Sequence, residues 1–186
     1  MMHASPSARK PFFRAIVALG GNLGATPEDV TAKDVPARFA SARSMLDARA
    51  DTRVAASSLL YRSPPLGPAD QPDYHNAVIL LETRLPPETL LAAMQAIEQA
   101  HGRIRTGVRW GPRTLDLDLV AHHDAVMDGD RLTLPHPRMH ERMFVLQPLC
   151  DIWPDWTHPR LGRTARELMQ TLLAEGCPPL LHGRPW

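Results

Sequence analysis

RWGPRTLDLDLVAHH, residues 109–123, contains the clearest strand signal in the chain. From Thr114 to Val120 three leucines alternate with other residues, so one face of an extended strand is apolar. The opposite face carries two acids, Asp116 and Asp118. A strand of this kind packs its apolar face on a hydrophobic core and leaves its acidic face open, either to solvent or to a functional site.

Further strands and helices are expected on both sides of this stretch. The β-branched run 14–19 stops at Gly20-Gly21-Asn22, and an N-cap signature at Thr26 predicts a helix that breaks at Pro36. Strands are expected at 14–19, 53–61 and 76–83, helices at 37–48, 87–101, 139–146 and 164–174, and a hairpin with an Asp128-Gly129 turn at 125–134. Helices and short connections both join the strands. This order favours an α+β fold, with helices over a mainly antiparallel sheet.

Length, composition and charge indicate what kind of protein this is. The chain has 186 residues, 44% hydrophobic and 22% charged, which predicts one domain at 14–186 behind a flexible extension at 1–13. A formal net charge of +1 disfavours a nucleic-acid partner, and two distant cysteines indicate a reducing compartment. No apolar run approaches the roughly 20 residues of a membrane span. We therefore expect a cytoplasmic monomer with no membrane partner.

The two acids predict a cation site. Same-face neighbours on a strand lie about 7 Å apart, close enough to converge on one or two hard cations such as Mg²⁺. Arg103, Arg105, Arg109 and Arg113 precede or flank the acids in a glycine-punctuated loop. Carboxylates, cations and guanidinium groups together suit a metal-bound polyphosphate. The alternatives are a solvated acidic face and an arginine bias of composition.

A long proline-rich connection, residues 62–75, precedes the strand at 76–83. At its end Tyr74 and Asn76 alternate, so both side chains should face the same way. An aromatic plane beside an amide suits a flat heteroaromatic ring with an amide-like edge. Ordinary packing next to a turn would also explain the pair.

Three long segments occur in a familiar order: SSLLYRSPPLGPADQPDYHNAV (57–78), HGRIRTGVRWGPRTLDLDLV (101–120) and LPHPRMHERMFVLQPL (134–149). With Gly20-Gly21-Asn22 after the first strand, they resemble the 6-hydroxymethyl-7,8-dihydropterin pyrophosphokinases of folate biosynthesis, most strongly over 15–156. The resemblance implies a ferredoxin-like fold. It also implies a Mg²⁺-dependent transfer of diphosphate from ATP to the hydroxymethyl group of the pterin, with release of AMP.

The resemblance also implies roles for individual residues. Two Mg²⁺ ions are held by Asp116 and Asp118, and the catalytic set comprises Arg103, Arg113, Asp116 and Asp118. ATP binding is expected at Gln95, Glu98, Arg105, Trp110, Arg113, His136 and Arg142. Pterin binding is expected at Ser63, Pro64, Leu66, Tyr74, Asn76, Trp110 and Phe144.

Two other function classes use parts of the same pattern. A metal-dependent phosphodiesterase or nuclease would need the acid pair but not Tyr74, Asn76 or Phe144. A non-catalytic nucleotide- or RNA-binding module would use the arginine loop, but unshielded carboxylates would repel its phosphates. Formation of AMP that depends on a pterin distinguishes the three.

Overall fold

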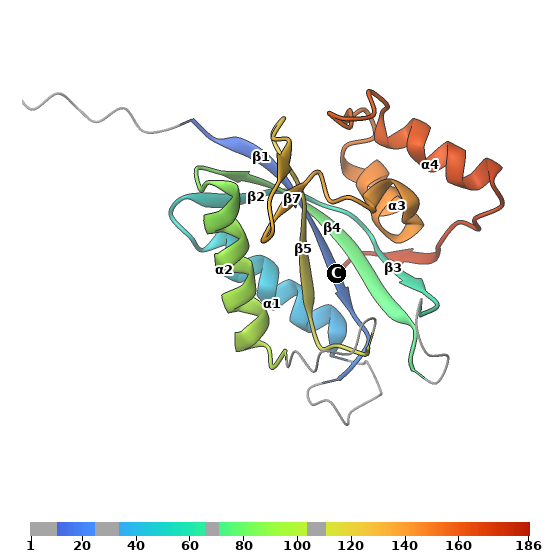
Figure 1. Cartoon of the computed structure of the whole chain (residues 1–186). Coiled ribbons are helices and arrows are strands. Elements are labelled where there is room, and N and C mark those ends of the chain that lie inside the picture. Colours follow the sequence, from blue (N-terminus) through green and yellow to red (C-terminus); the bar gives the residue numbers. More distant parts are fainter. Residues whose placement is uncertain (1–10, 25–33, 66–70, 104–110) are drawn as a thin grey trace, which may run out of the picture.

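The computed structural model describes residues 11–24, 34–65, 71–103 and 111–186. Within these residues a six-stranded antiparallel sheet has the order β5-β1-β4-β3-β8, with β2 also paired to β4 (Figure 1). The strands are β1 (Phe13–Gly21), β2 (Thr52–Ser57), β3 (Leu60–Ser63), β4 (Tyr74–Thr83), β5 (Asp116–His122) and β8 (Leu181–Arg184). The long central strands β1 and β4 hold the sheet together.

Helices pack on both faces of this sheet (Figure 1). The helices α1 (Val35–Asp47) and α2 (Pro87–Ala100) cover one face, and α3 (Met143–Ile152) and α4 (Ala165–Ala174) cover part of the other. A short 3-10 helix (Met139–Glu141) precedes α3, and β6 (Met127–Asp128) and β7 (Thr133–Leu134) form a separate hairpin. None of the described helices has the length and apolarity that a membrane crossing needs.

The alternation in β5 decides which side chains enter the core. Leu117 and Leu119 are buried on the α1 and α2 face, whereas Val120 belongs to the cluster under α3 and α4. Each buried leucine stabilises the fold by about 2 kcal/mol. Asp116 and Asp118 share the face of Val120, so the predicted alternation is confirmed.

Several expected elements differ in detail. The strand expected at 53–61 is wrong, because β2 and β3 are separate strands divided at Ser58, whose side-chain oxygen accepts from Val78 N at 2.9 Å. The helix expected at 139–146 is interrupted at Arg142, whose backbone is extended. The hairpin is confirmed but its loop spans 129–132, so the two-residue Asp128-Gly129 turn is wrong.

The ends of other elements agree better with the sequence. Pro36 lies in the first turn of α1, where a proline costs no hydrogen bond. The helix α4 begins after Thr164, which forms a reciprocal capping box with Glu167. The helix start expected at Thr26 lies outside the described residues, and β8 was not predicted.

Gly21 lies where β1 comes closest to the turn before β5. A Cβ atom at this position would come within 2.7 Å of the carbonyl oxygen of Thr114, whereas one at Gly20 would meet Asp116 Cβ at 3.7 Å. Gly21→Ala is therefore expected to lower the free energy of unfolding by about 2 kcal/mol, because backbone must move. Urea denaturation of Gly21→Ala and of its control Gly20→Ala measures the difference. Equal stability of the two variants would contradict this packing.

Candidate functional site

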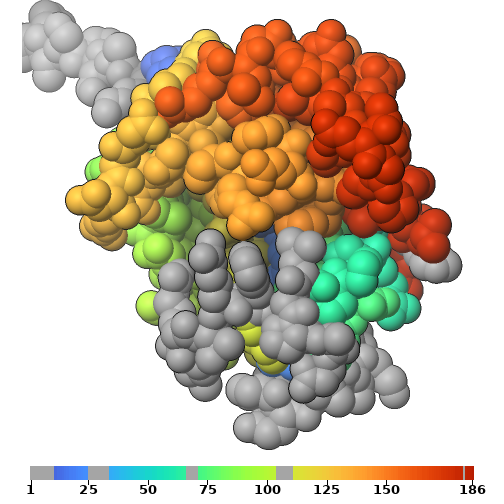
Figure 2. Space-filling view, turned by 45° about the vertical axis from the view of Figure 1, so that its right-hand side comes forward, coloured from blue at the N-terminus to red at the C-terminus, as the bar shows by residue number. Residues whose placement is uncertain are grey.

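A cavity of about 360 Å³ opens on the α3 side of the sheet, where β1, β4 and β5 extend beyond the helices. Figure 2 shows this side of the molecule, where atoms of the α3 region (orange) stand next to those of β3 (turquoise). The lining comprises Ala18, Leu19, Gly20, Ser63, Pro64, Tyr74, Asn76, Arg103, Arg113, Asp116, Asp118, His136, Arg142, Phe144 and Val145. Most of the residues expected to bind substrates therefore line one cavity.

Small residues of β1 form the floor beside the two acids. In the sheet Gly20 pairs with Asp116, and Ala18 pairs with Asp118. Since neither β1 residue has a long side chain, the carboxylates remain open to the cavity. The strand pairing thus creates space at the place where the acids point.

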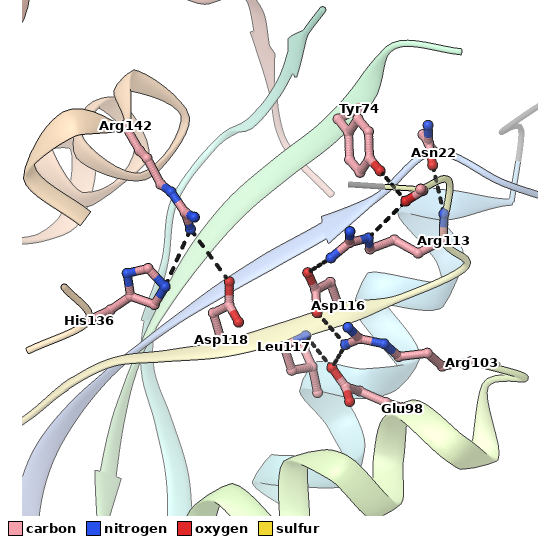
Figure 3. Close-up of polar contacts among 11 residues, drawn as sticks. Asn22, Tyr74, Glu98, Arg103, Arg113, Asp116, Leu117, Asp118, His136 and Arg142 are labelled. Carbon is pink, nitrogen blue, oxygen red and sulfur yellow. Dashed lines mark hydrogen bonds and ion pairs between the residues drawn. The ribbon is translucent and has the colours of Figure 1, made fainter. Parts of the chain in front are cut away.

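Arginines surround the acid pair (Figure 3). Asp116 forms ion pairs with both Arg103 and Arg113, and only 16% of its side chain is exposed. Asp118 is 45% exposed, and its Oδ2 lies 3.9 Å from Nη1 of Arg142. Three guanidinium groups therefore converge on two carboxylates.

Burial and neighbouring charges shift two pKa values of this cluster in opposite directions. Loss of solvation, followed by the negative charge of Asp116, raises the pKa of Asp118 to about 7. Burial, followed by the positive charge of Arg142, lowers the pKa of His136 to about 4. His136 is therefore neutral at pH 7, with its Nε2 atom 3.4 Å from Nη1 of Arg142.

Aromatic and amide side chains line the same cavity. Tyr74 donates its hydroxyl hydrogen to the carbonyl oxygen of Gly111 at 2.8 Å, which fixes the ring. Asn76 is buried, and its Nδ2 donates to Ser63 Oγ at 2.9 Å. Phe144 approaches from the start of α3. The structure thus brings the predicted ring-binding residues together.

Two of the residues expected to bind ATP, Gln95 and Glu98, lie on α2. Gln95 is half-buried on α2 and is not among the described residues that line the cavity. Glu98 is buried, accepts from Leu117 N at 2.8 Å and forms an ion pair with Arg103. It therefore holds α2, β5 and Arg103 together. Leu66, Arg105 and Trp110 lie outside the described residues.

Asn22 is a supporting residue to which the sequence assigned no role. Its Oδ1 accepts from Arg113 N at 2.9 Å, and its Nδ2 donates to Gln71 Oε1 and to Pro72 O, both at 3.0 Å. Asn22 thus joins the end of β1 to the segment before Tyr74 and to the turn before the acids. Its place after Gly20-Gly21, at the end of the first strand, was the sequence feature that could have indicated this role.

Arg38 of α1 was also missed. Its guanidinium is buried and donates to the carbonyl oxygens of Leu23 at 2.9 Å, Thr114 at 2.8 Å and Gly24 at 2.6 Å. It lies on the helix face that contains Phe39 and Ala42. A charged residue among core positions could have indicated a structural role for Arg38. Arg38 fixes the turn that leads into β5.

The chain is similar to proteins of known families. The model of the 7,8-dihydro-6-hydroxymethylpterin-pyrophosphokinase (HPPK) family matches residues 16–154. A Pseudomonas aeruginosa protein named 2-amino-4-hydroxy-6-hydroxymethyldihydropteridine pyrophosphokinase is 45% identical over 163 residues, which cover 88% of this chain and 94% of that protein. A Synechocystis protein of the same name is 44% identical, over 84% of this chain and 74% of its own length.

Solved structures support the same assignment at the level of the fold. A Plasmodium falciparum HPPK-DHPS triple mutant matches with a TM-score of 0.68 at 12% identity. The match covers 91% of this chain, which spans only 45% of that longer protein. The expected ferredoxin-like α+β fold is confirmed. From its sequence relatives and the matched segment, this chain belongs to the 7,8-dihydro-6-hydroxymethylpterin-pyrophosphokinase family.

Proposed function

We propose that the cavity between β1, β4, β5 and α3 is the active site for the reaction of this family. The enzyme transfers diphosphate from ATP to the hydroxymethyl group of hydroxymethyldihydropterin, in folate biosynthesis. One observation supports the location above all others: acids, arginines, aromatic rings and an amide line a single cavity. A polyphosphate and a flat heterocycle can lie together in such a space.

The acid pair fits Mg²⁺ that arrives with ATP. Among the described residues no group of three or more His, Cys, Asp and Glu side chains could hold a metal by itself. Mg²⁺ is typically held by one or two carboxylates, completed by substrate phosphates and water. Asp118 is open to the cavity and its carboxylate lies beside that of Asp116, so a cation would stabilise both charges. We assign two ions to Asp116 and Asp118.

The chain itself supplies positioning and charge. Mg²⁺ held by Asp116 and Asp118 would offset phosphate charge and lower the pKa of the attacking hydroxyl group. Arg103, Arg113 and Arg142 can exchange their carboxylate partners for phosphate oxygens and offset charge that develops there. We assign no general base, because both acids act as ligands. Contacts of Arg105, Trp110 and Leu66 with the substrates stay predictions.

The pterin is assigned to the part of the lining that contains Ser63, Tyr74, Asn76 and Phe144, which we call the pterin end. Tyr74 and Phe144 offer aromatic faces, while Asn76 is held in place by Ser63 and presents its amide to the ring edge. His136 is neutral and can contact the nucleotide without adding charge. The use of ATP suits a cytoplasmic enzyme, and the expectation of a monomer stays a prediction.

An AMP assay tests the proposal. With MgATP and 6-hydroxymethyl-7,8-dihydropterin the chain is expected to release AMP and pterin diphosphate in equal amounts. Omission of the pterin, or excess chelator, should stop AMP formation, and added Mg²⁺ should restore it. AMP released without pterin, or cleavage of a phosphodiester, would instead support the phosphodiesterase alternative. ATP binding without any AMP would support the binding module.

A further inference from the structure

We propose that residues 180–186, which lie beyond the segment matched by the family model, form a clasp that positions the pterin end of the cavity, with Trp186 as the principal positioning residue. This inference rests on the proposed function. Four sets of contacts carry it, and they connect α1, β3, β8 and α3.

Trp186 connects α1 to the corner between β2 and β3. Its ring meets Phe39 edge-on, with centroids 5.9 Å apart, and the guanidinium of Arg43 lies 4.6 Å from the Trp186 centroid. The indole Nε1 donates to the carbonyl oxygen of Ser58 at 2.9 Å, and Arg43 Nη1 donates to the carbonyl oxygen of Trp186 at 3.2 Å. Trp186 therefore has both packing and polar anchors.

Gln147 of α3 holds the other end of the clasp. Its Oε1 accepts from Leu180 N at 2.7 Å, and its Nε2 donates to Leu180 O at 3.2 Å. A side-chain amide that bonds to both the backbone N–H and the carbonyl oxygen of one residue fixes the position of that residue. The segment is thus attached at Leu180 to α3 and at Trp186 to α1.

Between these anchors β8 pairs with β3. Leu60 is opposite Arg184, and Arg62 is opposite Leu181. A Cβ atom on Gly183 would come within 2.9 Å of the Tyr61 ring, so β8 lies directly on that ring. The short strand β3 is therefore held by β4 on one edge and by β8 on the other.

Asp151 joins β3 to α3 a second time. The Tyr61 hydroxyl group lies 3.0 Å from each carboxylate oxygen of Asp151, to which it donates, and Leu59 N donates to Asp151 Oδ2 at 3.1 Å. Asp151 therefore couples β3 to α3, two of the elements that the clasp connects. A shift in β8 would move β3 and α3 together.

These same elements carry residues of the pterin end. The strand β3 ends at Ser63, whose hydroxyl group accepts from Asn76, and Phe144 lies in the first turn of α3. The acid pair lies on β5, at the opposite edge of the sheet from β8. Loosening the clasp should therefore affect the pterin more than MgATP.

The experiment compares Trp186→Ala with Trp186→Phe, Gln147→Ala and the control Leu181→Ala, whose residue is 64% exposed in the wild type. Trp186→Ala and Gln147→Ala are expected to raise the KM for pterin by about tenfold. KM for ATP and kcat should stay within about twofold. Trp186→Phe keeps the aromatic packing and should recover part of the loss, and Leu181→Ala should resemble the wild type.

Hydrogen exchange gives a readout that does not depend on activity. Amides of residues 60–63 should exchange faster in Trp186→Ala than in the wild type, without a comparable change in β5. Unchanged exchange in β3 would overturn the clasp, and so would an equal fall in kcat and in both substrate affinities with a lower Tm. Wild-type protein that makes no AMP would contradict the proposed function, while exchange would still decide whether the clasp exists.

Discussion

Asp116→Asn and Asp118→Asn are each expected to lower kcat/KM for AMP formation by about a thousandfold or more, with MgATP and pterin as substrates. Asparagine keeps the shape of the side chain but removes the charge that attracts Mg²⁺. Both acids face the same cavity floor, beside Gly20 and Ala18, so neither can replace the other at its position.

A matched control and a stability measurement separate catalysis from folding. Asp124→Asn removes a carboxylate just beyond β5 whose side chain is 86% exposed, and its activity should equal that of the wild type. In the absence of ATP, Asp116→Asn should have the lower Tm of the two site variants, because Asp116 forms ion pairs with Arg103 and Arg113. Either site variant with more than about a tenth of wild-type kcat/KM would refute the assignment of this pair as metal ligands.

Arg38→Met is expected to lower the free energy of unfolding by about 3 kcal/mol, because it leaves buried carbonyl oxygens without their guanidinium donors. Arg38→Lys should be intermediate, since a single ammonium group cannot reproduce the planar fork of donors. Activity should also fall, because the Thr114 carbonyl belongs to the turn that leads to Asp116.

Urea denaturation measures this effect, with Arg49→Met as the control. Arg49 is exposed just after α1, so its replacement should change stability by less than about 0.5 kcal/mol. If Arg38→Met were as stable as Arg49→Met, the three hydrogen bonds of Arg38 would contribute little to the fold.

Local patterns predicted much of the architecture. The period of two in β5 placed its leucines inside and its acids outside, and the helix expected at 164–174 corresponds to α4. These features depend on neighbours in the sequence. The break at Arg142 and the strand β8 depend on distant partners, and periodicity carries no signal for them.

In the site, too, local patterns predicted some residues, whereas others depend on distant parts of the chain. The acid pair predicted a cation site, and the Tyr74–Asn76 alternation predicted a surface for a flat ring. The family resemblance named most residues that line the cavity. The supporting bonds of Asn22 and Arg38 join segments far apart in the chain, so only the folded structure reveals them. Glu98 contacts Leu117 and Arg103 in the folded chain, and its expected contact with ATP stays a prediction.

The two faces of the sheet also have a consequence for evolution. Side chains that pack under α1 and α2 make one hydrophobic cluster, and those under α3 and α4 make another. Tyr74, Asn76, Asp116 and Asp118 belong to neither cluster. Leu19 and Val145 line the cavity and also belong to these clusters, so natural selection can change the polar part of the lining more freely than the apolar part.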